Sequence, residues 1–385
     1  MTLPLNTIMQ QRTVCVLMLI AAIFFLAVNY LPHKTFEPTF LRHIAEPVSD
    51  RPQPRTCQEM LPFYSESEVK GAGLNKSLVA ESWCLPQPRY LPLPPDNMHN
   101  CSLPYVSMNT KGRLGNKMCQ YMSLALLRKV FGIRVAMVGG MKIQIGPFFP
   151  KLSIPVEDHK CFPGHDTTDD FNNLYLKLIE WSAGRGTTLS DSQLHPYPLT
   201  KSTYVRDYPC PRNLLLPLRD HFREELSFQP ETIKKARYFL DNALKSVQDN
   251  STEEMTIITV HVRRTDYLTF ITYRYNILPL SMIYFVRAFN YYRERFARPV
   301  FVMTSDDPKW CKKHLVEKDV VFAGSGNAVV DMAILSLGDH HVITYGTYGF
   351  VSAFLGRGTI VYPDQNGKPI SYCFNSTFFQ PIYRD

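Results

Sequence analysis

Residues 261–266, His-Val-Arg-Arg-Thr-Asp, place two arginines and two other ionisable side chains within six positions. They follow an apolar, β-rich run at residues 255–260, which predicts a buried strand. Polar groups at the C-terminal end of such a strand lie where open α/β sheets bind ligands. Two adjacent guanidinium groups there suit an anion, above all a phosphate, because the planar fork of arginine donates two parallel hydrogen bonds to phosphate oxygens. A surface ion pair with Asp266 is the alternative interpretation.

Two later segments also follow predicted strands with groups that can bind a nucleotide. Residues 304–308, Thr-Ser-Asp-Asp-Pro, include Asp307, whose carboxylate can accept hydrogen bonds from a ribose or a guanine edge. A helix N-cap before Pro308 is the alternative. Residues 344–350 form a glycine turn before a helix start, where free N–H groups and the helix dipole attract anions. An ordinary tight turn is the alternative there.

A similar glycine turn occurs earlier, at residues 112–117, Gly-Arg-Leu-Gly-Asn-Lys. It leads into a helical pattern at residues 118–127. Taken alone, a plain loop is the simpler interpretation. The chain has no Gly-x-Gly-x-x-Gly pattern and no Walker-type phosphate loop, so a nucleotide would have to be held by segments such as these.

Strand-like runs alternate with helical patterns through the second half of the chain. The strand-like runs are residues 255–260, 300–304, 320–322, 342–344 and 359–362. Helical patterns are residues 279–298, 331–337 and a segment after Gly349. In the first of these helices an apolar stripe should face the core: Met282, Val286, Phe289, Tyr292 and Phe296. The alternation predicts an α/β fold with a parallel, Rossmann-like sheet.

The N-terminal region predicts a membrane anchor followed by a spacer. Residues 13–31 are almost wholly apolar and approach the ~20 residues that a bilayer core requires. A cleaved signal peptide is the alternative, but no small-x-small cleavage site follows. We therefore expect a cytosolic tail at residues 1–12, an uncleaved anchor at 13–31 and a stem at 32–104, which holds twelve of the 29 prolines.

Cysteines and glycosylation sequons indicate the side of the membrane. Eight of the nine cysteines follow the span, an even number that is compatible with disulfides in an oxidising lumen. Four Asn-x-Ser/Thr sequons also follow it. Asn100 would be a poor acceptor if Cys101 is bridged, so the predicted glycosylation sites are Asn75, Asn250 and Asn375. These features favour a type II protein with a short cytosolic tail and a luminal bulk.

The composition sets limits on the class of protein. The 385 residues are 45% hydrophobic and 12% aromatic, as in a globular protein, and the net charge is a mild +8. Without a dense Lys/Arg block we expect no nucleic-acid partner. The chain has neither a Cys-x-x-Cys pair nor a Cys/His cluster, so we expect no metal site.

The order of the four segments resembles the α-1,2-fucosyltransferase family, Golgi enzymes that use GDP-fucose. Its His-x-Arg-Arg-x-Asp motif corresponds to residues 261–266, and its Ser-Asp-Asp segment corresponds to residues 305–307. Its Gly-Arg-Leu-Gly-Asn-Gln-Met pattern corresponds to residues 112–118, with Lys117 in place of Gln. Its late Asp-x-Ala-x-Leu and Gly-Thr-Phe-Gly patterns correspond to residues 331–335 and 346–349, with Tyr for Phe. The resemblance covers roughly residues 105–365.

The resemblance implies a GT-B-like fold, two Rossmann-like halves facing a cleft behind the anchor and stem. Residues 105–254 would be the acceptor-side half, and residues 255–385 would bind GDP-fucose. The implied activity is inverting transfer of L-fucose from GDP-fucose to the 2-hydroxyl of a terminal galactose on a glycan. The implied location is the Golgi membrane.

The resemblance also implies roles for the site residues. Negative charge grows on the β-phosphate as GDP leaves, and Arg263 is the first choice to stabilise it, with Arg264 second. Asp266 would orient His261 or an arginine. The remaining donor-binding residues would be His261 and Asp307 near the nucleoside, Gly346, Thr347 and Tyr348 along the diphosphate, and Gly115 and Asn116. No cofactor is expected, because arginine can replace a metal cation.

Several alternatives stay open. The catalytic base is unassigned among Asp207, Glu224, Glu225 and Asp266, and the departing phosphate could itself take the proton. Rival functions are a fucosyltransferase of another linkage, such as core α-1,6 or protein O-fucosylation, and a transferase that uses another sugar nucleotide. A non-catalytic luminal glycan-binding protein is the rival from a different class.

Overall fold

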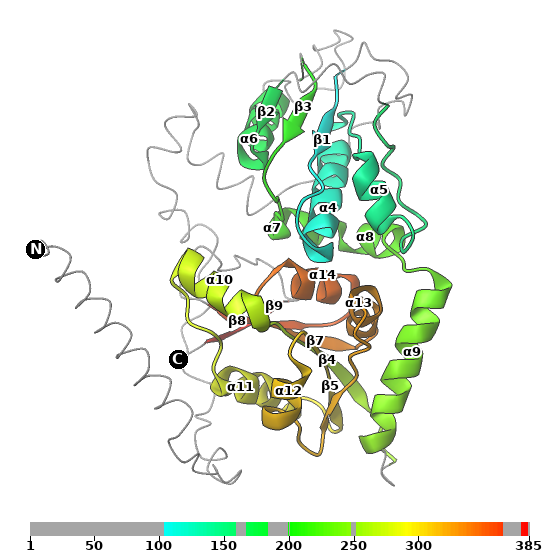
Figure 1. Ribbon diagram of the computed structural model, residues 1–385, viewed down its shortest axis with the longest axis vertical. Helices are drawn as coiled ribbons and strands as arrows, with labels where there is room; N and C mark the ends of the chain where they lie inside the picture. Colours follow the sequence, from blue (N-terminus) through cyan, green and yellow to red (C-terminus); the bar gives the residue numbers. More distant parts are fainter. Residues whose placement is uncertain are drawn as a thin grey trace, which may run out of the picture. The chain divides into compact units, whose positions relative to one another are not determined.

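A six-stranded parallel sheet organises the C-terminal half of the chain (Figure 1). Its strand order is β6 (Val320–Phe322), β5 (Pro299–Ser305), β4 (Thr256–Val262), β7 (His340–Ile343), β8 (Ile360–Asp364) and β9 (Phe379–Tyr383). Every neighbouring pair is parallel. The chain runs outward from β4 to β6 and then returns to the other side of β4 with β7, which is the strand order of the Rossmann fold.

Helices cover both faces of this sheet. They are α9 (Pro230–Leu244), α10 (Thr265–Tyr275), α11 (Met282–Arg293), α12 (Pro308–His314), α13 (Ala328–Ser336) and α14 (Thr347–Leu355). Residues of α11 pack with Ile258 and Val260 of β4 in one hydrophobic cluster. Residues of α9 and α13 pack with Val300 and Val302 of β5 in another. Burial on both faces explains why these strands are continuous apolar runs.

The N-terminal half contains a smaller parallel sheet, ordered β1 (Val106–Met108), β3 (Thr203–Val205) and β2 (Thr167–Asp169). Its helices are α4 (Leu114–Phe131), α5 (Gly139–Ile145), α6 (Phe171–Ala183), α7 (Arg212–Leu215) and α8 (Arg219–Glu225). Short 3-10 turns occupy Leu216–Leu218 and Lys245–Val247. The core of this half includes Phe350 and Phe354 of α14, so α14 packs against α4 and α8 as well as against its own sheet.

The structure, a computed structural model, describes residues 104–158, 167–183, 199, 201–247, 252–364 and 379–383. These residues belong to one unit, Gln53–Asp385. The predicted tail and span, and the stem except Pro104, lie outside the described residues. The predicted glycosylation sites lie outside them too: Asn75, Asn250 and Asn375.

The predicted α/β fold with parallel strands is confirmed. Each of the five predicted strands is found, shifted or extended by at most two residues at either end. The helix predicted at 279–298 is α11, which is shorter at both ends. The predicted stripe faces the core in large part: Phe289 and Tyr292 are fully buried, Met282 and Phe296 are half-buried against the same cluster, and Val286 is half-buried. The fully buried face of α11 also includes three residues outside that stripe, Tyr284, Phe285 and Ala288.

The predicted membrane localisation requires a correction. The sequence predicts a single-pass Golgi membrane protein held by a span at residues 13–31. Among the described residues, no helix is both long and apolar enough to cross a membrane. The longest of them, α4, has 18 residues and carries Lys117, Arg128 and Lys129. This finding contradicts the predicted localisation, and the predicted span itself lies outside the described residues.

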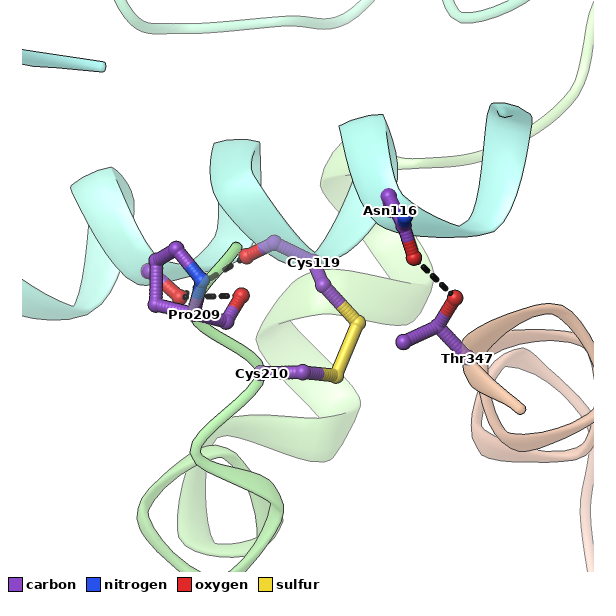
Figure 2. The surroundings of a disulfide bond; sticks show 6 residues. Asn116, Cys119, Pro209, Cys210 and Thr347 are labelled. Carbon is purple, nitrogen blue, oxygen red and sulfur yellow. Dashed lines mark hydrogen bonds between the residues drawn. A yellow bond between two sulfur atoms is a disulfide. The ribbon is translucent and has the colours of Figure 1, made fainter. Parts of the chain in front are cut away.

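A disulfide joins Cys119 in α4 to Cys210, just before α7 (Figure 2). Nearby, Ser123 donates to the carbonyl of Cys119 at 2.8 Å and lies 3.4 Å from that of Pro209. The disulfide therefore fixes α4 to the segment that leads into α8. Cys311, in α12, is a buried free thiol whose pKa burial raises to about 11.

Arg219 at the start of α8 holds the C-terminal end of α14. Its Nε donates to the carbonyl of Phe354 at 2.9 Å, and its Nη2 donates to the carbonyls of Ala353 and Gly356 at 3.1 and 3.0 Å. The last carbonyls of a helix have no partner inside the helix, and they carry the negative end of its dipole. The buried guanidinium of Arg219 donates to these carbonyls, and its charge offsets the negative end of the dipole. Arg219 therefore fixes α14 to the N-terminal half.

We expect Arg219→Ala to lower the free energy of unfolding by about 3 kcal/mol, because it removes charge-assisted hydrogen bonds and leaves buried carbonyls unpaired. Urea unfolding of the purified chain measures this. Arg223→Ala is the matched control: Arg223 is 29% exposed and makes one 3.3 Å bond to the carbonyl of Leu355. Its loss should stay below about 1 kcal/mol. Equal losses in the two variants would contradict the role of Arg219.

Candidate functional site

The order of the strands reverses between β4 and β7, because β5 and β6 lie on one side of β4 and the later strands lie on the other. His261 of β4 is in register with Thr304 of β5 on one side and with Ile343 of β7 on the other. The segments after these three strands therefore meet at one edge of the sheet. Open α/β sheets bind ligands in the crevice outside this edge.

Arg263 is held at this edge by contacts on three sides. Its backbone N–H donates to Thr344 Oγ1 at 2.8 Å. In its guanidinium, Nη1 contacts the carboxylate of Asp306 and lies 3.1 Å from Thr265 Oγ1. Nη2 donates to Asp266 Oδ1 at 2.5 Å. The side chain is 15% exposed, so it is fixed in place but still reaches solvent.

Arg264 has a different environment. Its Nε donates to Asp307 Oδ2 at 3.3 Å, and its Cζ lies 3.7 Å from the ring centroid of Trp310. Such stacking stabilises a guanidinium by a cation–π interaction. Its backbone N–H donates to Asp306 Oδ1 at 2.8 Å. The side chains of Arg263 and Arg264 thus have different partners and do not form one binding unit.

Asp307 has one of its two predicted roles in the structure. It is the N-cap of α12, with Oδ1 accepting from the backbone N–H of Trp310 at 3.1 Å, which confirms the N-cap interpretation. Its Oδ2 is the oxygen that pairs with Arg264. Asp306, by contrast, was not among the predicted site residues, yet it contacts both arginines.

Asp266 connects the two halves of the chain. Besides Arg263 it pairs with Arg113, whose Nη2 lies 3.2 Å from Asp266 Oδ2. Burial would raise the pKa of this carboxyl, but the charges of Arg263 and Arg113 keep it lowered. Three arginines and three aspartates therefore balance in what we call the arginine–aspartate cluster: Arg113, Arg263, Arg264, Asp266, Asp306 and Asp307.

Thr265 has a backbone conformation that side chains disfavour. Its φ is +27°, in a region that a β-branched residue rarely adopts. Such a conformation costs on the order of 1–3 kcal/mol and persists only where surrounding contacts impose it.

His261 lies beneath the start of α14 and is only 4% exposed. Its ring centroid is 5.1 Å from that of Tyr348, and a Cβ on Gly349 would come within 2.4 Å of its Nδ1. Burial first, and then the charge of Arg263, lowers its pKa to about 3. The imidazole is therefore neutral near pH 7. Among the described residues, its Nδ1 has no hydrogen-bond partner.

The glycine turns that begin α4 and α14 meet each other. Thr347 Oγ1 donates to Asn116 Oδ1 at 2.6 Å (Figure 2). A Cβ on Gly115 would lie 2.5 Å from the backbone nitrogen of Tyr348, so only glycine allows this approach. Gly346, with φ +98°, is the N-cap of α14 and has no side chain that could cap the helix. The first N–H groups of α14 thus keep the capacity to bind an anion.

Tyr348 contributes to this junction through its backbone and ring. Its hydroxyl donates to the carbonyl of Ala328 at 2.6 Å. Burial, and then the charge of Asp331, raises the pKa of the phenol. The structure therefore brings all four predicted segments together, and it gives contacts to three residues of these segments for which no contact was predicted: Arg113, Asp306 and Thr344.

Glu225, one of the candidate bases, is committed to the core of the N-terminal half. It is 5% exposed, accepts from the backbone N–H of Ser153 at 3.0 Å and pairs with His221 at 2.8 Å. Burial raises its pKa, but hydrogen bonds from His221, Ser153 and Tyr121 outweigh it and lower the pKa to about 2. Such a carboxylate is a poor proton acceptor.

The other base candidates differ in their surroundings. Asp207 Oδ1 accepts from the backbone N–H of Phe171 at 3.1 Å, and Glu224 is exposed. Within the described ranges, no three or more His, Cys, Asp or Glu side chains form a group that could hold a metal ion.

Comparisons with known proteins identify the family of the chain. The family described as glycosyl transferase family 11 matches residues 69–367. Galactoside 2-alpha-L-fucosyltransferase SEC1 of Bos taurus is 31% identical over 263 residues, 66% of each chain. The Sec1 protein of Mus musculus with the same description is 31% identical over 292 residues, 74% of this chain and 72% of that protein. Galactoside alpha-(1,2)-fucosyltransferase 1 of Saimiri boliviensis boliviensis is 28% identical over 322 residues, 79% and 82% of the two chains.

Solved structures of fucosyltransferases show a weaker likeness. One of NodZ from Bradyrhizobium has a TM-score of 0.42 at 11% identity, and it covers 69% of this chain and 97% of NodZ. One of FUT1 from Arabidopsis thaliana, in complex with GDP, has a TM-score of 0.40 at 13% identity, covering 80% and 82%.

We expect Gly115→Ala to separate the starts of α4 and α14, because its Cβ would clash with the backbone of Tyr348. Overpacking of this kind costs about 1–3 kcal/mol. Gly139→Ala is the matched control, since a Cβ on Gly139, also at a helix start, meets nothing within 4 Å. Thermal unfolding measures both variants, and a Gly115→Ala protein as stable as the control would contradict the close approach.

We also expect stability to fall as the pH drops below about 6.5. The pKa values of His261 and His341 are both lowered to about 3, mainly by burial. Between the unfolded pKa of about 6.5 and the folded value, the unfolded chain binds protons that the folded chain does not. Each histidine should therefore cost about 2 kcal/mol between pH 7 and pH 5.

Urea unfolding at several pH values tests this dependence. His261→Asn should make the decline in stability between pH 7 and pH 5 shallower, whatever its effect at pH 7. His314→Asn, at an exposed position, is the control and should retain the wild-type decline. An unchanged slope in His261→Asn would show that His261 is not buried in the neutral form.

Proposed function

The chain belongs to glycosyl transferase family 11, and on that premise we propose that it is an inverting fucosyltransferase. It would move L-fucose from GDP-fucose to the 2-hydroxyl of a terminal galactose on a glycan. The names of its curated relatives support this activity. The observation that carries the proposal is the fixed guanidinium of Arg263 at the C-terminal ends of β4 and β7, where the strand order reverses.

The reaction breaks the bond between fucose C1 and an oxygen of the β-phosphate. The acceptor hydroxyl attacks C1 from the opposite face and loses its proton, and GDP carries away the bonding electrons. Negative charge therefore grows on the β-phosphate in the transition state. A cation and N–H groups that meet this charge accelerate the reaction when they bind the transition state more strongly than the substrate.

Arg263 can provide this stabilisation without giving up its present contacts. A guanidinium has five N–H donors. In the part of the chain that the structure describes, the contacts use both donors of Nη1 and one of Nη2. The donors left, on Nε and Nη2, form one edge that can hold two phosphate oxygens. The catalytic role of Arg263 is thus to bind the diphosphate through this edge.

The aspartates have a positioning role in this proposal. Asp306 and Asp266 hold the guanidinium so that little reorganisation is needed when charge develops. Arg264 is the second arginine of the predicted catalytic set, and its ion pair with Asp307 and stacking on Trp310 support the adjacent backbone. Asp266 also recruits Arg113 from the N-terminal half.

The start of α14 would complete the diphosphate site. Gly346, Thr347 and Tyr348 supply backbone N–H groups at the positive end of the helix dipole. Gly115 and Asn116 hold that end in place. Asp307 and His261 keep their proposed places near the nucleoside. No metal cofactor enters this proposal, because the arginines supply the cationic charge.

The wider architecture belongs to the proposal as well. We place the site in a cleft of a GT-B-like fold, with residues 105–254 on the acceptor side and residues 255–385 binding the donor. α9 packs on the C-terminal sheet although it precedes residue 255.

A transfer assay with product analysis tests the function. The purified chain is incubated with GDP-fucose or other sugar nucleotides and a panel of galactose-ended glycans, with and without EDTA. We expect fucose on O-2 of galactose, at the same rate in EDTA. Fucose on another position, transfer from another donor, or GDP binding without turnover would each identify one of the rival functions.

We expect Arg263→Ala to lower kcat at least 100-fold and to weaken GDP binding about tenfold or more, since a charge-assisted contact contributes about 1.5–3 kcal/mol. Arg263→Lys should recover only part of the rate, because lysine keeps the charge but loses the planar fork. Arg295→Ala, at an exposed arginine on a tyrosine ring, is the control and should match the wild type. Turnover of Arg263→Ala within a few-fold of the control would refute the role.

A further inference from the structure

Thr265 has a backbone that glycine would adopt with less strain. Among the described residues, the non-glycine residues with positive φ are Thr265, at +27°, and Asn276, at +51°. Asn276 ends α10, a position where the left-handed conformation is common and asparagine tolerates it. Thr265 begins the same helix and is β-branched, which makes the conformation unfavourable. The side chain of Thr265 must therefore make contacts that glycine could not.

The hydroxyl of Thr265 lies at the centre of the arginine–aspartate cluster. It accepts from Arg263 Nη1 at 3.1 Å. It lies 3.0 Å from Asp266 Oδ1 and also contacts the carboxylate of Asp306, and it can donate its single proton to either. It thus joins the guanidinium to both carboxylates that hold it.

The backbone conformation allows these contacts to form together. Asp306 accepts from the backbone N–H of Arg264 through Oδ1 at 2.8 Å, while its Oδ2 contacts Arg263 and Thr265. The carboxylate of Asp306 thus contacts three consecutive residues: Arg263, Arg264 and Thr265. Without the Thr265 hydroxyl, one hydrogen-bond donor between the carboxylates of Asp266 and Asp306 would be lost. The guanidinium of Arg263 would also lose one of the contacts that limit its rotation.

We infer that Thr265 is a positioning residue whose hydroxyl fixes the orientation of Arg263. This inference rests on the proposed function and deepens it. The hydroxyl and the two carboxylates occupy one side of the guanidinium and leave the Nε edge for the diphosphate. The strained backbone conformation is retained because it places the Thr265 hydroxyl in contact with Arg263, Asp266 and Asp306.

Three substitutions distinguish the effect of the Thr265 hydroxyl from the effect of its backbone conformation. Thr265→Ser keeps the hydroxyl, Thr265→Val keeps the shape and branching without it, and Thr265→Gly relieves the backbone and removes the side chain. Asn276→Gly is the matched control, because it relieves the other positive φ at the far end of α10. For each variant, kcat, the KM for GDP-fucose, the Kd for GDP and the Tm are measured.

We expect Thr265→Ser to keep kcat within about threefold of wild type, while Thr265→Val and Thr265→Gly lower it at least tenfold and raise the Kd for GDP. KM for GDP-fucose should rise less than kcat falls, because orientation matters most for charge that develops in the transition state. Thr265→Gly should lower kcat and weaken GDP binding without lowering the Tm. A merely structural role of Thr265 would lower the Tm together with kcat. Asn276→Gly should leave kcat unchanged.

The inference is overturned if Thr265→Gly or Thr265→Val retains wild-type kcat, or if Thr265→Ser is as impaired as Thr265→Val. If the wild type transfers no fucose at all, the proposed function fails separately. The Kd values for GDP then still test Thr265, because equal affinity in wild type and Thr265→Val overturns its role.

Discussion

The ion pairs that hold Arg263 to Asp306 and Asp266 are the interactions on which the site depends. They fix a cation at the C-terminal ends of β4 and β7, where the strand order reverses, and they leave part of its hydrogen-bond donors unused. A guanidinium free in solvent would have to be ordered each time charge developed on a ligand. Here the guanidinium is already ordered before a ligand binds. Two carboxylates, the hydroxyl of Thr265 and the backbone hydrogen bond to Thr344 hold it. The balance of charge in the cluster also means that binding rests on geometry more than on a broad positive field.

The placement of α14 is the second constraint. Its N-terminal turn comes three residues after Thr344, which accepts from the backbone N–H of Arg263, so small movements of the helix would change where its N–H groups point. Both ends are held by the N-terminal half, through Asn116 at the start and Arg219 at the end. The disulfide links the two supports, because Cys119 lies one turn beyond Asn116 in α4 and Cys210 lies in the segment leading to Arg219 (Figure 2). The position of α14 is therefore set by both halves: α13 and β7 of its own sheet, and α4 and α8 of the N-terminal half.

Much of the fold could be predicted from the sequence, because it depends on local patterns. β-branched runs bounded by turns predicted the strands, and their alternation with helices predicted the parallel sheet. The four site segments were found because glycine turns and ionisable residues at strand ends are visible in sequence. The contacts among them were not, since Asn116 and Thr347 are 231 positions apart and Arg263 and Asp306 are 43 apart. The stacking of Arg264 on Trp310 and the positive φ of Thr265 likewise arise only after folding. In α11 the predicted stripe was incomplete, because Tyr284, Phe285 and Ala288 are buried beside Phe289 and Tyr292.

A crystal structure of the chain with GDP tests the central claim most directly. The account predicts that the β-phosphate lies on the Nε and Nη2 edge of Arg263, within hydrogen-bond distance of the first N–H groups of α14. It also predicts that Asp306 and Asp266 keep their contacts with the same guanidinium. A diphosphate bound away from the ends of β4 and β7, or one that displaces Asp306 from Arg263, would contradict it.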